Sequence, residues 1–194
     1  MIAIGKVLHE EKELSLVSPG VFESALEESE IERILKIVNN IEMMDATVDG
    51  EHNPEIRSCR GGWIDYTDKT AWLYGRLYDL VLLANKSLWE FDPVDMVEHV
   101  MYCEYEEGDH YDWHVDLASP PPFNGRKIAV SVQLSSSDDY RGGNLLFMAG
   151  GIHTVSRAKG SIIAYPTYIP HCVEKISAGK RKSLVFWVGG KPFK

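Results

Sequence analysis

The stretch GRKIAVSVQLS, residues 125–135, has the clearest strand pattern in the chain. The apolar residues Ile128, Val130, Val132 and Leu134 alternate with other residues, so all four lie on one face of an extended strand. Segments rich in turn-forming residues flank the stretch, with SPPPFNG before it and SSSDDYRGG after it. The stretch therefore predicts a β-strand with one continuous apolar face.

Similar short runs fill the second half of the chain. They lie at about residues 97–105, 111–116, 126–135, 144–148, 152–156, 161–165, 172–177 and 182–188. Two further turn segments, AGG and SAGK, separate the later runs. Many short strands joined by turns at this spacing are typical of a β-sandwich or jelly roll, and we predict such a core.

The first half of the chain is predicted to be mostly helical. The segment SEIERILKIVNN begins with Ser29 and Glu32 at capping-box spacing and then repeats apolar residues at helical intervals. Residues 67–87 contain a second helical pattern, with Asp68 as the predicted cap. Between the two, the run RSCRGGWI at 57–64 predicts a short strand. We expect these helices to support a sheet rather than to carry chemistry.

The 194 residues are interpreted as one domain, because no linker or internal repeat divides them. Residues 1–95 are expected to supply mostly helical support and outer strands. Residues 96–190 are expected to form the jelly-roll catalytic core. The predicted fold class is thus mainly β with flanking α-helices around a jelly roll.

The sequence carries no signal for a membrane or an export pathway. The longest apolar runs, such as 80–84, are far shorter than the ~18 residues of a membrane span. The N-terminal stretch MIAIGKVLHEEKE lacks a long apolar region followed by a cleavage site. Cys59, Cys103 and Cys172 are an odd number without C-x-x-C spacing, which fits reduced thiols. We therefore predict a cytoplasmic protein with no membrane partner.

The net charge of −9 is unevenly spread along the chain. Residues 1–100 carry a net charge of −11, and residues 101–194 carry a net charge of +2. The negative net charge of the chain argues against sequence-independent binding of nucleic acid. From Arg141 onward Glu174 is the only acidic residue, which leaves room for a local anion site, although a solvated basic face is the simpler interpretation.

The segment GDHYDWHVDLASPPP contains the motif His-x-Asp twice, at His110 and Asp112 and again at His114 and Asp116. Residues two apart in a strand point to the same face, so an imidazole and a carboxylate can converge on one metal ion. A single His-x-Asp motif is nevertheless weak evidence for a metal site. Simple alternation places all four residues on one face, so periodicity does not choose between the two pairs.

His171 offers a third ligand at the start of another predicted strand. Two histidines and one carboxylate on one face of an octahedral ion form the facial triad of non-haem Fe(II) oxygenases. Such a triad leaves three positions open, two for a bidentate 2-oxo acid and one for O₂. Either His-x-Asp pair would complete it together with His171.

Arg181 is a candidate anchor for the distal carboxylate of 2-oxoglutarate. It follows His171 by ten residues and the turn SAGK, so we expect it on the strand adjacent to that of His171. The guanidinium fork matches a carboxylate with two hydrogen bonds, and Ser183 on the same strand face can add a third. The competing interpretation places Arg181 in an exposed basic run, KRK.

The combined order of these motifs resembles a known family. The pattern is Tyr105-x-x-Gly108-x-x-Tyr111-x-x-His114-x-Asp116, followed by YRGGNLLF, GSIIAYP, His171 and Arg181. Over about residues 95–190 it is similar to the Fe(II)/2-oxoglutarate-dependent dioxygenases, and within them to the prolyl 4-hydroxylase-like branch. Five elements fall in order with workable spacings, so the resemblance is specific.

This resemblance implies a double-stranded β-helix with iron bound by His114, Asp116 and His171. It also implies that Arg181 binds 2-oxoglutarate and that Tyr105 donates a hydrogen bond to the distal carboxylate of the cosubstrate. Only His114 has tyrosines nine and three residues before it and a glycine six before it. The family pattern therefore selects His114 over His110.

The remaining polar and aromatic residues of this segment have weaker assignments. His110 and Asp112 are expected to lie at the rim of the site or on the substrate side. Tyr111 and Trp113 are candidates for the substrate entrance, with packing as the alternative. Trp187 shares a strand face with Arg181 and is expected to face the core beside the cosubstrate.

The predicted function is the hydroxylation of an unactivated C–H bond, favouring prolyl residues of a protein or peptide, with release of succinate and CO₂. The cofactors that this implies are Fe(II), 2-oxoglutarate and O₂, with ascorbate as an optional addition. Collagen-type relatives use Lys where this chain has Arg181, so a collagen substrate is not expected. The alternatives are an oxidative demethylase of alkylated nucleic acid and a non-catalytic jelly-roll binding protein.

Overall fold

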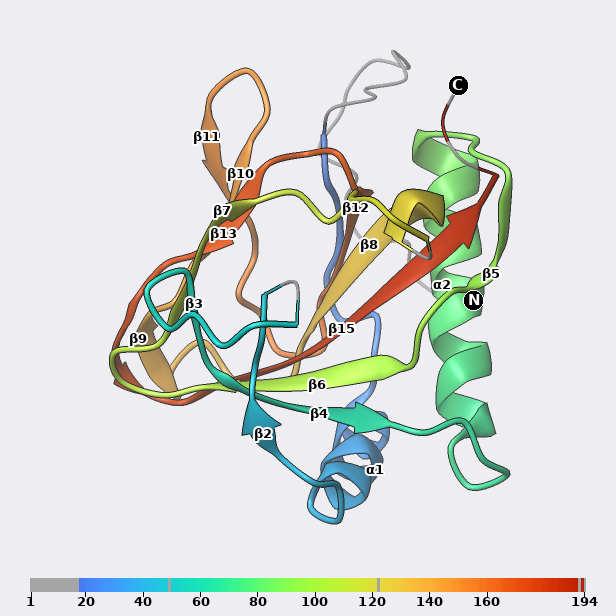
Figure 1. The fold of residues 1–194 in the computed structure, drawn as a ribbon. Coiled ribbons are helices and arrows are strands. Elements are labelled where there is room, and N and C mark those ends of the chain that lie inside the picture. Colours follow the sequence, from blue (N-terminus) through green and yellow to red (C-terminus); the bar gives the residue numbers. More distant parts are fainter. Residues whose placement is uncertain (1–17, 49, 122, 192, 194) are drawn as a thin grey trace.

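The structure, a computed structural model, describes residues 18–48, 50–121, 123–191 and 193. Within this part the chain forms two α-helices, α1 (Glu28–Val38) and α2 (Ala71–Leu88), one short 3₁₀ helix (Phe123–Gly125) and fifteen β-strands. The predicted fold class, mainly β with flanking helices, is confirmed (Figure 1). The prediction about the N-terminal stretch MIAIGKVLHEEKE lies outside the described residues.

Eight strands form the larger sheet, and every pairing in it is antiparallel. In spatial order they are β1 (Gly20–Phe22), β12 (Ile162–Pro166), β8 (Arg126–Gln133), β15 (Arg181–Gly190), β6 (Val100–Tyr105), β4 (Arg60–Ile64) and β2 (Met44–Asp45), with β5 (Pro93–Met96) paired to the far end of β15. The central strand β8 is buried along its whole length, so both faces of the sheet are covered.

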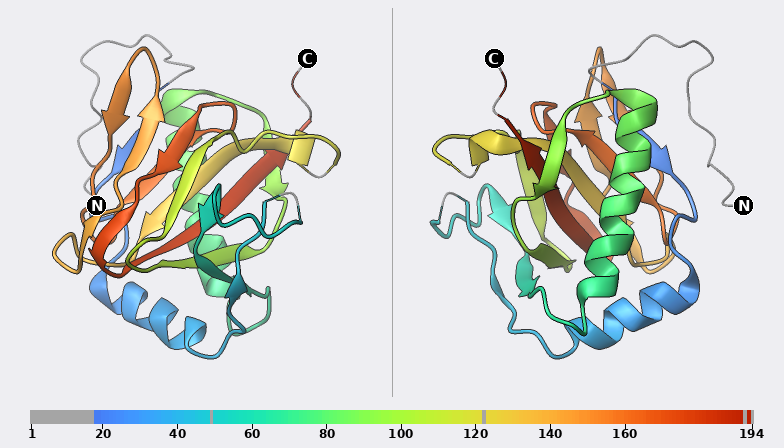
Figure 2. Two further views of the ribbon diagram at one scale, coloured as in Figure 1. Left: turned by 60° about the vertical axis from the view of Figure 1, so that its left-hand side comes forward. Right: turned by 90° about the vertical axis from the view of Figure 1, so that its right-hand side faces the viewer.

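The smaller sheet faces the larger one and has five strands (Figure 2, left). Their order is β11 (Ile152–Thr154), β10 (Leu145–Met148), β13 (His171–Val173), β7 (His110–His114) and β3 (Arg57–Ser58). A separate two-stranded sheet joins β9 (Tyr140–Gly142) to β14 (Ile176–Gly179).

Both helices cover the outer face of the larger sheet (Figure 2, right). The four alternating residues Ile128, Val130, Val132 and Leu134 belong to the buried cluster that includes apolar side chains of α1 and α2. The apolar face predicted for residues 125–135 is therefore the face that the helices bury. In the described part of the chain, neither helix is long and apolar enough to cross a membrane.

The helix starts differ from the predicted caps. Helix α1 begins after Glu27, whose main-chain N–H donates to the carboxylate of Glu30 at 2.8 Å, so the capping box lies two residues before the predicted one. Helix α2 begins after Thr70 rather than Asp68. The acid-rich start of α1 offers several boxes of equal spacing, and packing of the apolar face selects one of them.

Two predicted strands divide between sheets. The run 57–64 becomes β3 in the smaller sheet and β4 in the larger one, with Cys59 at the crossover. The run 172–177 divides into β13 and β14 in the same way. Four short strands, β1, β2, β5 and β9, lie outside the predicted runs. Local composition predicts extended backbone, but it carries no information about which partner strand is available.

Candidate metal centre

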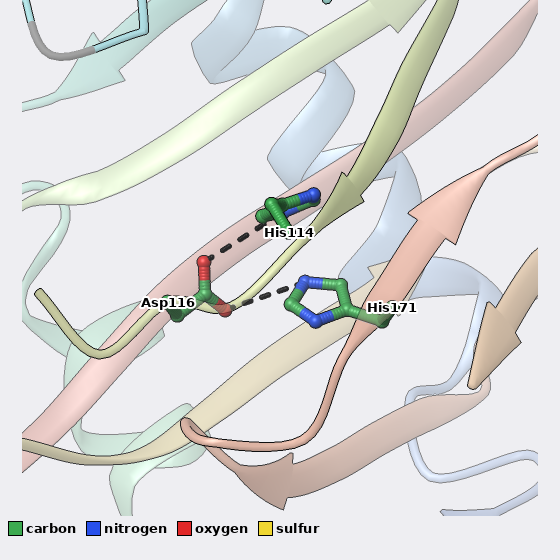
Figure 3. Close-up of side chains that lie close together, drawn as sticks. All are labelled: His114, Asp116 and His171. Carbon is green, nitrogen blue, oxygen red and sulfur yellow. Dashed lines mark ion pairs between the residues drawn. The ribbon is translucent and has the colours of Figure 1, made fainter. Parts of the chain in front are cut away.

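His114, Asp116 and His171 converge between the two sheets (Figure 3). His114 is the last residue of β7, His171 is the first residue of β13, and the two stand opposite each other in the register of these paired strands. Asp116 follows β7 and is held by its main-chain N–H, which donates to the carbonyl of Thr167 at 2.9 Å. One potential ligand atom from each of the three side chains lies within 4.8 Å of the others.

Both imidazoles present the same nitrogen to Asp116. The Nε2 atom of His114 lies 3.9 Å from Oδ1 of Asp116, and Nε2 of His171 lies 3.5 Å from Oδ2 (dashed in Figure 3). Nδ1 of His114 lies 2.7 Å from the carbonyl of Asp112, and Nδ1 of His171 lies 3.0 Å from that of Ile169. A carbonyl only accepts hydrogen bonds, so both Nδ1 atoms donate, which leaves the Nε2 lone pairs available for a metal.

The protonation state of His114 also suits a metal ligand. Burial, with a smaller contribution from the charge of His171, lowers the pKa of His114 to about 4. His114 is therefore neutral at pH 7, as coordination requires. In an octahedral site with bonds of about 2.1 Å, neighbouring donors lie about 3 Å apart, so the observed spacings need only a small contraction. Among the common metals, two imidazoles and one carboxylate suit Fe(II) with open positions.

A β-bulge decides which side chains of β7 face this centre. His171 stands opposite His114 but Val173 stands opposite Tyr111, so β7 contains one residue more than β13 over the same distance. As a result the rings of Tyr111 and His114 lie on the same side and stack with centroids 3.5 Å apart. The prediction that positions 110, 112, 114 and 116 share one face is therefore wrong.

His110 and Asp112 do not line the cavity at this centre. Nε2 of His110 instead lies 3.0 Å from the carbonyl of Glu55, and the main-chain carbonyl of Asp112 supports His114. Their predicted place at the rim or on the substrate side is not what the structure shows. Tyr111 lines the cavity as expected, but Trp113 does not.

The three side chains open into a cavity of about 920 Å³ between the two sheets. Arg181 lines the same cavity and is only 1% exposed, so it is not part of an exposed basic run. Its Nη1 lies 3.4 Å from the hydroxyl of Ser183, whereas Nε and Nη2 are buried and have no hydrogen-bond partner. A buried guanidinium with unpaired N–H groups is a strong site for a carboxylate.

Tyr105 stands directly opposite Arg181 across the pairing of β6 and β15. Its ring lies 5.4 Å from the guanidinium carbon, and both side chains line the cavity. Strand β15 belongs to the larger sheet, so Arg181 is not on a strand adjacent to β13 as predicted. The two sheets instead bring Arg181 to the metal centre across the interior.

The profile of the 2OG-Fe(II) oxygenase superfamily matches residues 100–189, which include all of these residues. The chain belongs to the 2OG-Fe(II) oxygenase superfamily. The resemblance drawn from the sequence is therefore confirmed.

Relatives of this oxygenase include named hydroxylases. A PKHD-type hydroxylase of Synechococcus sp. (strain CC9902) is 30% identical over 141 residues, which are 72% of this chain and 62% of that protein. A PKHD-type hydroxylase of Acaryochloris marina (strain MBIC 11017) is 36% identical over 96 residues, 47% of this chain and 42% of that protein. The chain thus spans less than two thirds of the length of these relatives.

Two solved structures share the fold. A Pseudomonas putida prolyl-4-hydroxylase superimposes with a TM-score of 0.72 at 21% identity, covering 91% of this chain and 95% of that one. A prolyl hydroxylase of Trichoplax adhaerens superimposes with a TM-score of 0.73 at 17% identity, covering 88% of this chain and 83% of that one. It was solved with a peptide fragment of the hypoxia inducible factor oxygen degradation domain. At such identities the likeness concerns the fold alone, and it confirms the predicted jelly roll.

Two residues of the oxygenase site were not among the predicted site residues. The hydroxyl of Tyr165 lies 3.1 Å from Nε2 of His171 and 3.4 Å from Oδ2 of Asp116. Arg126, the first residue of β8, donates to the main-chain carbonyl of Asp116 at 3.1 Å. Tyr165 follows strand alternation in the segment GSIIAYP, but nothing in the spacing of Arg126 relates it to Asp116.

Proposed function

We propose that this chain is an Fe(II)- and 2-oxoglutarate-dependent dioxygenase that hydroxylates an unactivated C–H bond. The observation that carries the proposal is the pairing of two features in one cavity: the cluster of His114, Asp116 and His171, and the buried, unpaired N–H groups of Arg181. The first is the donor set of a facial Fe(II) triad. The second matches the far carboxylate of a dicarboxylic 2-oxo acid.

In this proposal the protein supplies binding and orientation. His114, Asp116 and His171 hold Fe(II), which when bound supplies the oxidation chemistry together with 2-oxoglutarate and O₂. Arg181 and Ser183 bind the distal carboxylate, and Tyr105, which stands opposite Arg181, adds a hydrogen-bond donor. The cosubstrate is thereby oriented between the metal at one end and Arg181 at the other. No side chain needs to act as a general base.

The mouth of the cavity favours an apolar substrate group. Trp63 is 41% exposed and Val115 is 43% exposed, yet both line the cavity, as does the buried indole of Trp187. Exposed apolar side chains at a cavity mouth mark a contact surface for a ligand. We infer that the substrate is a prolyl residue of a protein or peptide, in keeping with the prolyl hydroxylases that share the fold.

The test is 2-oxoglutarate-dependent release of succinate by protein loaded with Fe(II) under anaerobic conditions and then exposed to O₂. Proline-rich peptides should accelerate the release, and peptide mass should rise by one oxygen atom. Asp116→Ala is the matched inactive control. Absence of succinate from protein that binds Fe(II) and 2-oxoglutarate would overturn the proposed activity. Acceleration by methylated oligonucleotides but not by peptides would overturn the proposed substrate.

A further inference from the structure

Arg57 is a second cation of the cavity, and the proposed function does not use it. It lies on the edge strand β3 and stands opposite Tyr111 in the register of β3 and β7. Its guanidinium carbon lies 4.6 Å from the centroid of the Tyr111 ring, and both side chains line the cavity. The Tyr111 ring in turn stacks on the ring of His114. A single aromatic side chain therefore connects this guanidinium to a proposed metal ligand.

The protein satisfies the N–H groups of Arg57 poorly. An arginine side chain carries five N–H donors. One of them, on Nη1, donates to the main-chain carbonyl of Thr47 at 3.2 Å. Nη2 lies 3.7 Å from the sulfur atoms of Met101 and Cys103, which are weak acceptors. Nε is buried and has no hydrogen-bond partner among the described residues. Arg57 therefore retains donor capacity for a ligand.

The charge of Arg57 is not balanced within the part of the chain that the structure describes. None of the ion pairs found there includes Arg57. Of the described acidic residues that line the cavity, Glu98 pairs with Arg126 and Asp116 is a proposed metal ligand. The third, Asp45, is exposed to solvent. A guanidinium does not lose its proton in a folded protein, so one positive charge remains at the cavity wall.

The cosubstrate of the proposed function does not need this charge. Arg181 and Ser183 bind its distal carboxylate, and its 2-oxo acid end binds the metal. Arg57 also lies nearer the mouth than Arg181 does. Its hydrogen-bond partner Thr47 is exposed, whereas Arg181 is 1% exposed. The ligand that remains for Arg57 is the substrate.

The position of Arg57 makes the site selective for charge. A substrate that covers the guanidinium removes it from water, which costs free energy unless an opposite charge takes the place of the water. A carboxylate supplies that charge and two acceptor oxygens that match the guanidinium. A neutral group would leave the cation buried and unpaired, so anionic and neutral substrates must differ in affinity.

We propose that Arg57 binds a carboxylate of the substrate close to the C–H bond that is hydroxylated. The substrate is then a prolyl residue with a negative charge beside it. This inference rests on the proposed function and narrows its substrate class. The same chemistry has two sources, the terminal carboxylate of a C-terminal proline or the side chain of an acidic residue next to an internal proline.

The experiment measures binding without turnover. Protein loaded with Mn(II) and 2-oxoglutarate is titrated by calorimetry, in the absence of O₂, with short proline peptides in matched pairs. One pair ends in proline, as the free acid or the amide. Two further pairs have blocked ends and carry aspartate or asparagine directly before or after an internal proline. An acidic peptide should bind at least about tenfold more tightly than its neutral partner, and the pair that shows this identifies the source of the carboxylate.

Three variants assign the preference to Arg57. Arg57→Met should abolish the difference between acidic and neutral peptides and leave the affinity for 2-oxoglutarate unchanged. Arg57→Lys should keep part of the difference, since the charge remains but the planar fork is lost. Arg60→Met is the matched control, because Arg60 is exposed and donates to the carbonyl of Met43. Should circular dichroism show that Arg57→Met does not fold, Arg57→Gln takes its place.

Several outcomes would overturn the role of Arg57. They are equal binding of acidic and neutral peptides by the unaltered chain, no binding of any acidic peptide, and a preference that survives in Arg57→Met. A loss of 2-oxoglutarate affinity in Arg57→Met would assign the guanidinium to the cosubstrate instead. The proposed function is decided separately, by release of succinate from the protein loaded with Fe(II).

Discussion

Arg126 and Asp116 are joined by a hydrogen bond of 3.1 Å, from the guanidinium Nη1 of Arg126 to the main-chain carbonyl of Asp116. The same guanidinium makes two bonds of 2.6 Å with the carboxylate of Glu98 and lies over the ring of Trp187. Thr167 links the two residues a second time. Its hydroxyl donates to the main-chain carbonyl of Arg126, and its main-chain carbonyl accepts from the N–H of Asp116. Arg126 therefore orients the segment that carries one of the three proposed ligands.

Replacing this guanidinium should weaken metal binding. Arg126→Met is expected to lower Fe(II) affinity about 10- to 100-fold, the usual cost of losing a group that orients a ligand. It should also lower the free energy of unfolding by about 3 kcal/mol, because Glu98 is left largely buried and unpaired. Anaerobic Fe(II) titration and chemical denaturation measure the two effects.

The two effects of Arg126→Met can be separated. Adding Glu98→Gln removes the unpaired charge and should recover stability without recovering Fe(II) affinity. Arg76→Met breaks the ion pair with Glu30, which joins the helices, and should lower stability alone. Unchanged Fe(II) affinity in Arg126→Met would show that Asp116 is oriented without it.

Arg181 is expected to strengthen the binding of 2-oxoglutarate and to lower the stability of the ligand-free protein. Arg181→Met is expected to weaken 2-oxoglutarate binding by about 2–5 kcal/mol, at least about 30-fold, while Fe(II) stays bound. In the absence of ligand the same variant should be more stable by about 1 kcal/mol or more, since an unpaired buried charge is removed. Calorimetric titration with 2-oxoglutarate and thermal unfolding of the ligand-free protein test both. Loss of stability together with unchanged 2-oxoglutarate affinity would exclude the anchor role.

Redox-inert Mn(II) should stabilise the protein through the same three donors as Fe(II). At 100 times the dissociation constant, the free energy of unfolding should rise by about 2.7 kcal/mol, because the unfolded chain lacks the assembled site. His114→Ala should abolish this stabilisation. His110→Ala should retain it, since His110 contacts the carbonyl of Glu55 and does not line the cavity. The opposite outcome for the two histidines would move the site to the other His-x-Asp motif.

Much of the fold was accessible from the sequence because its signals are local. Alternation over residues 125–135 has a period of two, which depends only on extended backbone, and it correctly identified the face that the helices bury. The order of motifs along the chain also supported the resemblance to the Fe(II)/2-oxoglutarate-dependent dioxygenases. That resemblance named His114, Asp116, His171 and Arg181, which the structure gathers around one cavity. Spacing of this kind is a property of the chain itself.

Tertiary structure alone decided how the segments meet, because strand pairing joins residues far apart in the chain. The bulge between β7 and β13 turned Tyr111 and His114 to one side and overrode simple alternation. The hydrogen bond from Arg126 to the main chain of Asp116 arises the same way, from pairing and packing between distant segments. No local pattern encodes such contacts, since each depends on which partner the fold places opposite.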